Sequence, residues 1–237
     1  MKLKNYTEKE KSELIKIGLE NVITHWADNN DLKKAPKVFA AGEGCYVYDI
    51  NGRKYLDTFS SLITSIIGHN RPEIKQTVVE QMDKIAFFPN YHDSFSVPLI
   101  QLAKKLSEIM PGDLEVSFFV NSGSEANETA IKIARQYFWQ TGKRSKYKVI
   151  SRKNSYHGTT IAAASYSGFP SLWEFLEPTV AGHLFATTPN KAIETDFKDG
   201  GEASLNEMEE IILKEGPDTI AALIMDPIPG SNSGYPI

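Results

Sequence analysis

The stretch VNSGSEANETAIKIARQYF, from Val120 to Phe138, begins as a turn of small polar residues and continues as a helix. Ser122 followed three residues later by Glu125 is typical of a helix start, where the two side chains bond to backbone N–H groups. This arrangement leaves the N–H groups of Gly123 and Ser124 free at the positive end of the helix dipole. Because Gly123 has no Cβ, an anion can approach the backbone there. The turn therefore predicts a phosphate site, with a capped helix that binds nothing as the alternative.

The same stretch also predicts which face of its helix is buried. Small and apolar side chains recur in it at helical spacing, with the small ones nearest the turn. We expect the following residues to form the buried stripe: Ala126, Ala130, Ile133, Ala134 and Tyr137.

The sequence around this helix alternates apolar strands with helices. Strands are expected at residues 115–120, 146–151, 183–187 and 219–225, the last one ending at Asp226, and a helix is expected at 204–216. Such alternation predicts an α/β domain whose parallel-rich sheet has helices on both faces.

The N-terminal part has a different pattern. A helix is expected over residues 7–28, then short strands joined by turns at 42–44 and 51–52, then helices over 72–85 and 98–110. We therefore expect a small N-terminal α+β segment over residues 1–65 and a large α/β domain over 66–237.

Composition excludes several classes of function. The 237 residues are 41% hydrophobic and 24% charged, with a net charge of −4 and interspersed signs, so no nucleic-acid partner is expected. The single cysteine excludes an internal disulfide framework and a cysteine-based structural zinc site, and we expect no metal. The polar N-terminus and the lack of a long apolar run favour a cytoplasmic protein without a membrane partner.

A second turn, at Tyr156-His157-Gly158, follows the strand expected at 146–151. An aromatic face suits stacking on a flat ring, and a glycine permits close approach. His157 is either a proton carrier or, as lone histidines more often are, a structural group. His69, which precedes the helix expected from Pro72, is interpreted as a turn residue.

Other phosphate and nucleophile motifs are missing from the sequence. It contains neither G-x-x-x-x-G-K-[ST] nor G-x-G-x-x-G after a strand. It also lacks the G-x-S-x-G nucleophile elbow, which disfavours a serine hydrolase that would use Ser122 or Ser124 with His157.

Three segments together resemble a known family: NSGSEANETAIKIAR, NSYHGTTIAAAS and MDPIPG. In this order and spacing they are similar to the class III aminotransferases of fold type I, which use pyridoxal 5′-phosphate. The segment LDTFSSLITSIIGHNRPEI is also similar, and the match is collinear from about residue 35 to the end. The resemblance implies the large domain of a fold-type I pyridoxal-phosphate-dependent transferase, present only in its N-terminal half.

The resemblance also implies a cofactor site. Gly123 and Ser124 match residues that hold the cofactor phosphate, and Tyr156 matches the aromatic residue stacked on the pyridine ring. Asp226 stands where the family usually has glutamate, so the hydrogen bond of that longer side chain is in question. The full set of cofactor residues implied is Ser122, Gly123, Ser124, Tyr156, His157, Gly158 and Asp226.

A substrate pocket is implied by three further matches, at Ile63, Phe88 and again Tyr156. Ile63 stands where the amine:pyruvate branch of the family often has tryptophan. The activity implied is transfer of an amino group from an amine or omega-amino acid to an oxo acid such as pyruvate, by a homodimer.

The resemblance places the Schiff-base lysine after the motif that begins at Asp226, whereas the last lysine here is Lys214. No catalytic residue is therefore assigned in this chain, and we expect the chain alone to be inactive. Two alternatives stay open: an aminomutase of the same family, and a non-catalytic truncated fragment or structural subunit.

Overall fold

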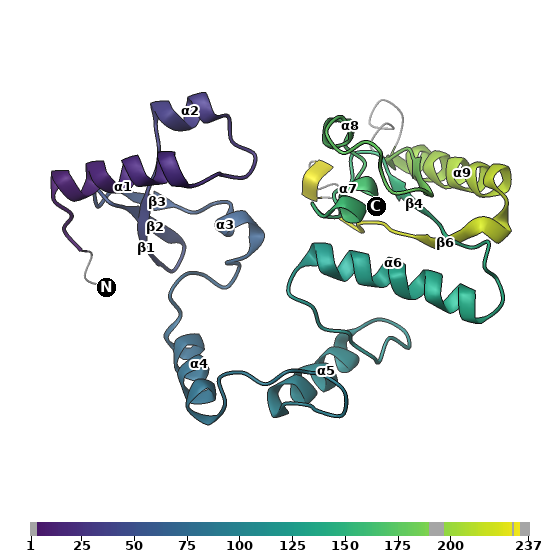
Figure 1. The fold of residues 1–237 in the computed structure, drawn as a ribbon, viewed down its shortest axis with the longest axis horizontal. Helices are drawn as coiled ribbons and strands as arrows, with labels where there is room; N and C mark the ends of the chain where they lie inside the picture. Colours follow the sequence, from purple (N-terminus) through teal and green to yellow (C-terminus); the bar gives the residue numbers. More distant parts are fainter. Residues whose placement is uncertain (1–3, 190–196, 229, 233–237) are drawn as a thin grey trace. The chain divides into compact units, whose positions relative to one another are not determined.

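The computed structural model describes residues 4–189, 197–228 and 230–232 of the chain. Contacts between Cα atoms divide it into two units, Met1–Lys104 and Lys105–Ile237, which are described separately below (Figure 1). The boundary between the segments 1–65 and 66–237 stays a prediction.

The N-terminal unit begins with two short helices, α1 (Glu8–Asn21) and α2 (Asn29–Lys34). Thr7 caps α1, because its hydroxyl accepts a hydrogen bond from the Glu10 N–H while the Glu10 carboxylate accepts one from the Thr7 N–H. The prediction of one helix over 7–28 was wrong. Trp26, with φ of 56°, has a left-handed backbone that a right-handed helix excludes.

An antiparallel sheet follows, made of β1 (Phe39–Glu43), β2 (Tyr46–Asp49) and β3 (Lys54–Leu56) in that order. The turn predicted at 51–52 is confirmed, whereas the one predicted at 42–44 lies at Gly44-Cys45, because Gly42 and Glu43 pair with β2 as part of β1. Gly44 and Gly52 have φ values of 58° and 78°, a conformation that glycine adopts without steric cost.

Three further helical segments follow: α3 (Ser60–Ile63), α4 (Pro72–Lys84) and α5 (Val97–Ile109), the last of which crosses the boundary between the two units at Lys104. The last two confirm the predicted helices to within one residue at each end. Pro72 occupies the start of α4, where its missing N–H removes no helical hydrogen bond.

The C-terminal unit contains a parallel sheet of β4 (Lys148–Arg152), β5 (His183–Ala186) and β6 (Ile220–Leu223). The strand order is β5-β4-β6, so the central strand β4 pairs in parallel with both neighbours. This confirms the predicted parallel sheet.

Helices cover both faces of this sheet (Figure 1). On one face Ile150 packs against Met208 of α9, and on the other Val149 packs against Ile131 of α6 and Tyr166 after α7. Successive side chains of a strand point to opposite faces, so β4 fills both cores. The helical segments of this unit are α6 (Gly123–Gln140), α7 (Ile161–Ser165), α8 (Pro170–Trp173), α9 (Phe197–Glu215), η2 (Pro217–Thr219) and η3 (Gly230–Asn232).

The strand predicted at residues 115–120 was wrong. In the described part of the chain this segment pairs with no strand, and Val116 is 96% exposed. An apolar, alternating sequence forms a strand only where a neighbour pairs with its N–H and C=O groups. The strand predicted at 219–225 is confirmed, but it ends at Leu223, three residues before Asp226.

The buried face predicted for α6 was also wrong. Ile131 is its buried residue, whereas most of the predicted stripe is exposed. Polar contacts select the other face: Asn127 Nδ2 donates to the His157 carbonyl, and Arg135 donates to the Tyr147 carbonyl and the Tyr166 hydroxyl. These anchors recur at the same helical spacing as Ile131.

Replacing Ile150 with alanine should lower the free energy of unfolding by about 2–5 kcal/mol, because a fully buried side chain leaves a cavity. The measurement is urea unfolding of the chain followed by circular dichroism. Ile133→Ala, on the exposed side of α6, is the control and should have a much smaller effect. Equal losses in the two variants would contradict the assigned core.

Candidate functional site

The first turn of α6 is capped as its sequence predicts. The Ser122 hydroxyl accepts a hydrogen bond from the Glu125 N–H at 3.2 Å. The Glu125 carboxylate accepts one from the Asn121 N–H at 2.7 Å, one residue earlier than in a standard capping box. The cap thus satisfies two N–H groups and leaves the ones between them unused.

Two of these unused groups belong to Gly123 and Ser124. Among the residues that the structure describes, the backbone N–H groups of Gly123 and Ser124 have no hydrogen-bond partner. A Cβ built on Gly123 would meet no atom within 4 Å. A helix start with free N–H groups and room beside them is suited to bind an anion.

Hydrogen bonds fasten the first turns of α6 to the turn that follows β4. The Thr159 N–H donates to Ser124 Oγ at 3.1 Å, and Asn127 Nδ2 donates to the His157 carbonyl at 2.6 Å. The Thr160 hydroxyl donates to the Glu128 carboxylate at 2.5 Å. The structure therefore brings the two predicted turns together, at the end of β4 where parallel sheets usually bind ligands.

Gly158 is required by this contact. Its φ is 133°, and a Cβ there would lie 2.5 Å from Ser124 Oγ and 2.8 Å from the Cβ of Ala163. Any other residue would push the two turns apart, so the close approach that the structure shows at Gly158 is to Ser124.

Tyr156 and His157 have different environments. Tyr156 is 42% exposed, so its ring has surface available for stacking, whereas His157 is only 4% exposed. The His157 N–H donates to Ser167 Oγ at 2.8 Å, and its Nδ1 lies 3.9 Å from Asp226 Oδ1. That separation is too long for a hydrogen bond. His157 is thus packed into the turn, as in its structural interpretation, with a carboxylate nearby.

Neither serine of the α6 turn is arranged as a nucleophile with His157. Within the described residues, Ser122 Oγ and Ser124 Oγ bond to the backbone N–H groups of Glu125 and Thr159. A serine hydrolase needs a base bonded to the nucleophile, so the geometry gives this alternative no support.

Sequence reasoning missed Arg152, the last residue of β4. It is 7% exposed, and its Nε and Nη1, like Nε2 of His157, have no hydrogen-bond partner in the described part of the chain. Burial lowers the pKa of the Arg152 guanidinium, and the Asp226 carboxylate opposes this shift. The only signal for Arg152 in the sequence was a positively charged residue directly after a strand that was expected to be buried.

A cavity of about 10 Å³ lies beside Arg152 and Asp226, large enough for about one water molecule. A buried guanidinium needs acceptors, and a single water can bridge it to a carboxylate that does not reach it. The cavity is lined by Arg152, Asn154, Ser155, Thr188, Pro189 and Asp226.

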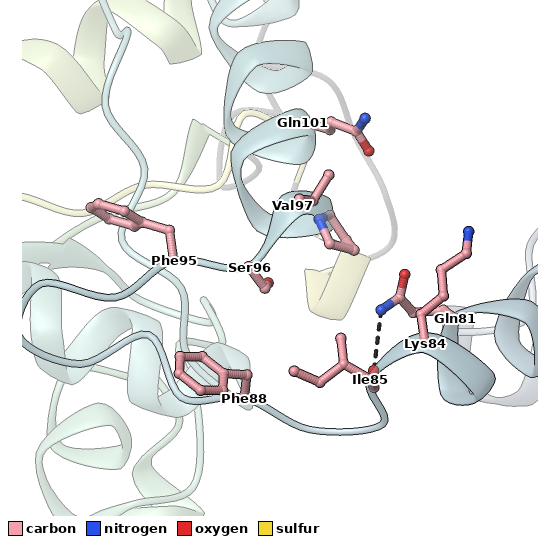
Figure 2. Close-up of a pocket in the computed structure, with 9 residues that line it drawn as sticks. Gln81, Lys84, Ile85, Phe88, Phe95, Ser96, Val97 and Gln101 are labelled. Atoms are coloured by element: carbon pink, nitrogen blue, oxygen red, sulfur yellow. Dashed lines mark hydrogen bonds between the residues drawn. The ribbon is translucent and has the colours of Figure 1, made fainter.

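The predicted substrate residues Ile63 and Phe88 belong to the N-terminal unit. Phe88 lines a cavity of about 540 Å³ between the end of α4 and the start of α5, where Ile85 and Phe95 also lie (Figure 2). Tyr156 belongs to the C-terminal unit, so a pocket shared by all three residues stays a prediction.

The described residues contain no cluster of three or more histidine, cysteine or acidic side chains that is arranged to hold a metal ion. Within the same residues, no helix combines the length and the apolar character needed to cross a membrane.

The stability of the chain should depend on pH through His157. Burial lowers the pKa of His157, with Asp226 opposing, so the unfolded chain binds a proton more readily than the folded one. The free energy of unfolding should therefore fall as the pH decreases below about 6.5, the ordinary pKa of histidine. His157→Gln should flatten this dependence, as measured by urea unfolding between pH 5 and about 8. The exposed His25→Gln is the control, and equal slopes in the two variants would refute the prediction.

Comparisons with known proteins bear on the family of this chain. The family model for class III aminotransferases matches residues 28–236. An uncharacterized aminotransferase of Bacillus subtilis, YhxA, is 43% identical over 204 residues, which are 86% of this chain and 43% of that protein.

Two solved structures share the fold. An (S)-enantioselective omega-transaminase from Thermomicrobium roseum superimposes with a TM-score of 0.91 at 34% identity, over 98% of this chain and 52% of that one. The omega-transaminase of Pseudomonas jessenii, solved in complex with PMP, has a TM-score of 0.89 at 30% identity, over 94% and 51%.

The chain thus spans about half the length of the proteins it matches. The predicted α/β fold is confirmed, because it matches omega-transaminase structures over almost the whole chain. The predicted resemblance is confirmed as well: this chain belongs to the class III aminotransferase family.

Proposed function

We propose that these residues form the phosphate-holding half of a pyridoxal-phosphate-dependent transaminase. The reaction moves an amino group from an amine or omega-amino acid to an oxo acid such as pyruvate. The observation that carries this proposal is the pair of N–H groups at Gly123 and Ser124 that have no partner among the described residues, in a turn bonded through Ser124 Oγ to the turn that carries the half-exposed Tyr156. Family membership supports the choice of cofactor.

The residues present fit a phosphate group. The N–H groups of Gly123 and Ser124 would donate to phosphate oxygens, and the dipole of the 18-residue helix α6 would favour the negative charge. Ser124 Oγ accepts the Thr159 N–H, so its own hydroxyl proton remains available for a further donation. Three donors thus converge from one turn.

The residues around the turn fit a flat ring. The half-exposed ring of Tyr156 would stack on the cofactor ring, and Gly158, two residues later, permits the close approach of this turn to Ser124. Behind this turn, Asp226 supplies a negative charge to the buried Arg152 and His157. In this proposal Asp226 therefore orients the buried side chains of Arg152 and His157. Its Oδ1 lies 3.9 Å from Nδ1 of His157, which is too far for a direct hydrogen bond.

When bound, pyridoxal phosphate supplies an electron sink for bond changes at the amino-bearing carbon of the substrate. The contribution of this chain is to bind the phosphate and to orient the ring. The proton carrier of the reaction is the lysine that the family resemblance places after the Asp226 motif. Lys214 is the last lysine of this sequence, so we infer that residues 1–237 alone do not transaminate.

The partners in this proposal are small amines, oxo acids and a second copy of the complete subunit. The family supports the homodimer, and the omega-transaminase structures support an amine donor.

Changes in the two turns should weaken the binding of pyridoxal phosphate. Tyr156→Ala removes a stacking contact of about 1 kcal/mol, which raises Kd about fivefold. Gly123→Leu places a side chain in the open space beside the free N–H groups and should raise Kd further. The measurement is isothermal titration calorimetry, with Tyr137→Ala on the exposed side of α6 as the control. Unchanged affinity in both turn variants would argue against the assigned roles.

The 237-residue chain, loaded with pyridoxal phosphate and supplied with an amine donor and pyruvate, should produce no alanine above a protein-free control. The reason is the missing proton carrier after the Asp226 motif. Alanine formation with repeated turnover would show that a lysine within this chain serves that role.

A further inference from the structure

The segment α3 is a single left-handed turn built from four consecutive residues that are not glycine. Ser60, Ser61, Leu62 and Ile63 have φ values of 47°, 49°, 60° and 63°. For L-residues this conformation is unfavourable because Cβ crowds the following carbonyl oxygen. Such a run persists only where its surroundings hold it in place.

The Asp57 carboxylate provides that hold. Its Oδ2 accepts a hydrogen bond from Ser61 Oγ at 3.1 Å and lies 2.8 Å from Nε2 of His69. The side chains of Asp57 and His69 are both mostly buried. The hydrogen bond from His69, followed by those from Ser61, lowers the pKa of Asp57, so the carboxylate is ionised at neutral pH.

His69 is itself fixed to the antiparallel sheet. Its backbone exchanges two hydrogen bonds with Gly44, at 3.0 and 2.7 Å, in the turn between β1 and β2. Its ring lies against Gly42, where a Cβ would come within 2.8 Å of Cγ. The chain of contacts therefore runs from the sheet through His69 and Asp57 to Ser61.

Hydrogen bonds rather than packing keep the turn closed. The N–H groups of Ile63, Thr64 and Ser65 donate to carbonyls of Phe59 and Ser60 at 2.8–2.9 Å. A cavity of about 480 Å³ lies beside Asp57, Ser61 and His69, so this side of the turn is not filled by other side chains. Ile63 is 65% exposed.

We propose that Asp57 is a positioning residue: with His69 behind it, it holds α3 in its left-handed turn and thereby fixes the direction of Ile63. Ile63 is a predicted substrate-pocket residue, so its direction would affect which amine donor is accepted. This consequence rests on the proposed function. The hold of Asp57 and His69 on α3 does not rest on the proposed function, because all of its contacts lie within residues 42–69.

The test is hydrogen–deuterium exchange of the full chain, without cofactor, read at the amides of Ile63, Thr64 and Ser65. Ser61→Ala keeps the unfavourable backbone but removes the bond to Asp57, so exchange there should become about tenfold faster. Asp57→Ala should have the same effect. Amides of α4 should not change in either variant.

Ser61→Gly is the matched rescue variant. It lacks the same hydroxyl, but glycine adopts the left-handed conformation without steric cost, so protection should return close to that of the wild type. Exchange as fast in the glycine variant as in the alanine variant would overturn the proposal, and so would unchanged exchange in Ser61→Ala. The result is independent of pyridoxal phosphate, so a failure here is distinct from a failure of the proposed function.

Discussion

The hydrogen bond from the Thr159 N–H to Ser124 Oγ is the contact on which the candidate site depends. Residues 122–124 begin α6 and residues 156–160 follow β4, so the two turns are distant in the sequence. Besides this bond, the Asn127 amide donates to the His157 carbonyl, the Thr160 hydroxyl donates to the Glu128 carboxylate, and the missing side chain at Gly158 permits the close approach. The proposed phosphate site depends on this contact, because it keeps the start of α6 next to the turn that carries Tyr156.

Two buried polar side chains next to the turns have atoms that lack hydrogen-bond partners among the described residues. Within the described part of the chain, Arg152 and His157 are buried and have side-chain nitrogen atoms without a hydrogen-bond partner, and the nearby carboxylate of Asp226 lies 3.9 Å from the His157 ring. A glutamate, the usual residue in the family motif, is one methylene longer. Aspartate thus replaces glutamate beside Arg152 and His157, the buried side chains with nitrogen atoms that lack direct hydrogen-bond partners among the described residues. The small cavity there offers room for a bridging water.

Local signals in the sequence predicted much of the structure, because caps and turns depend on neighbouring residues. The Ser122 cap, the turn at Gly52 and the parallel sheet are confirmed. The errors arose where distant residues decide the outcome. The buried face of α6 follows from polar anchors on Asn127 and Arg135, and residues 115–120 pair with no strand among the residues that the structure describes. Arg152 and the link between Asp57 and His69 have no local signature.

The most direct measurement is an NMR titration of the 15N-labelled chain, first with inorganic phosphate and then with pyridoxal phosphate. If the α6 turn binds the phosphate, the amide resonances of Gly123 and Ser124 will move downfield and saturate with both ligands. Pyridoxal phosphate will additionally shift the resonances of Tyr156 and its neighbours through the ring. Shifts confined to lysine-rich surface segments, with Gly123 and Ser124 unmoved, would contradict the assignment of this turn as the phosphate site.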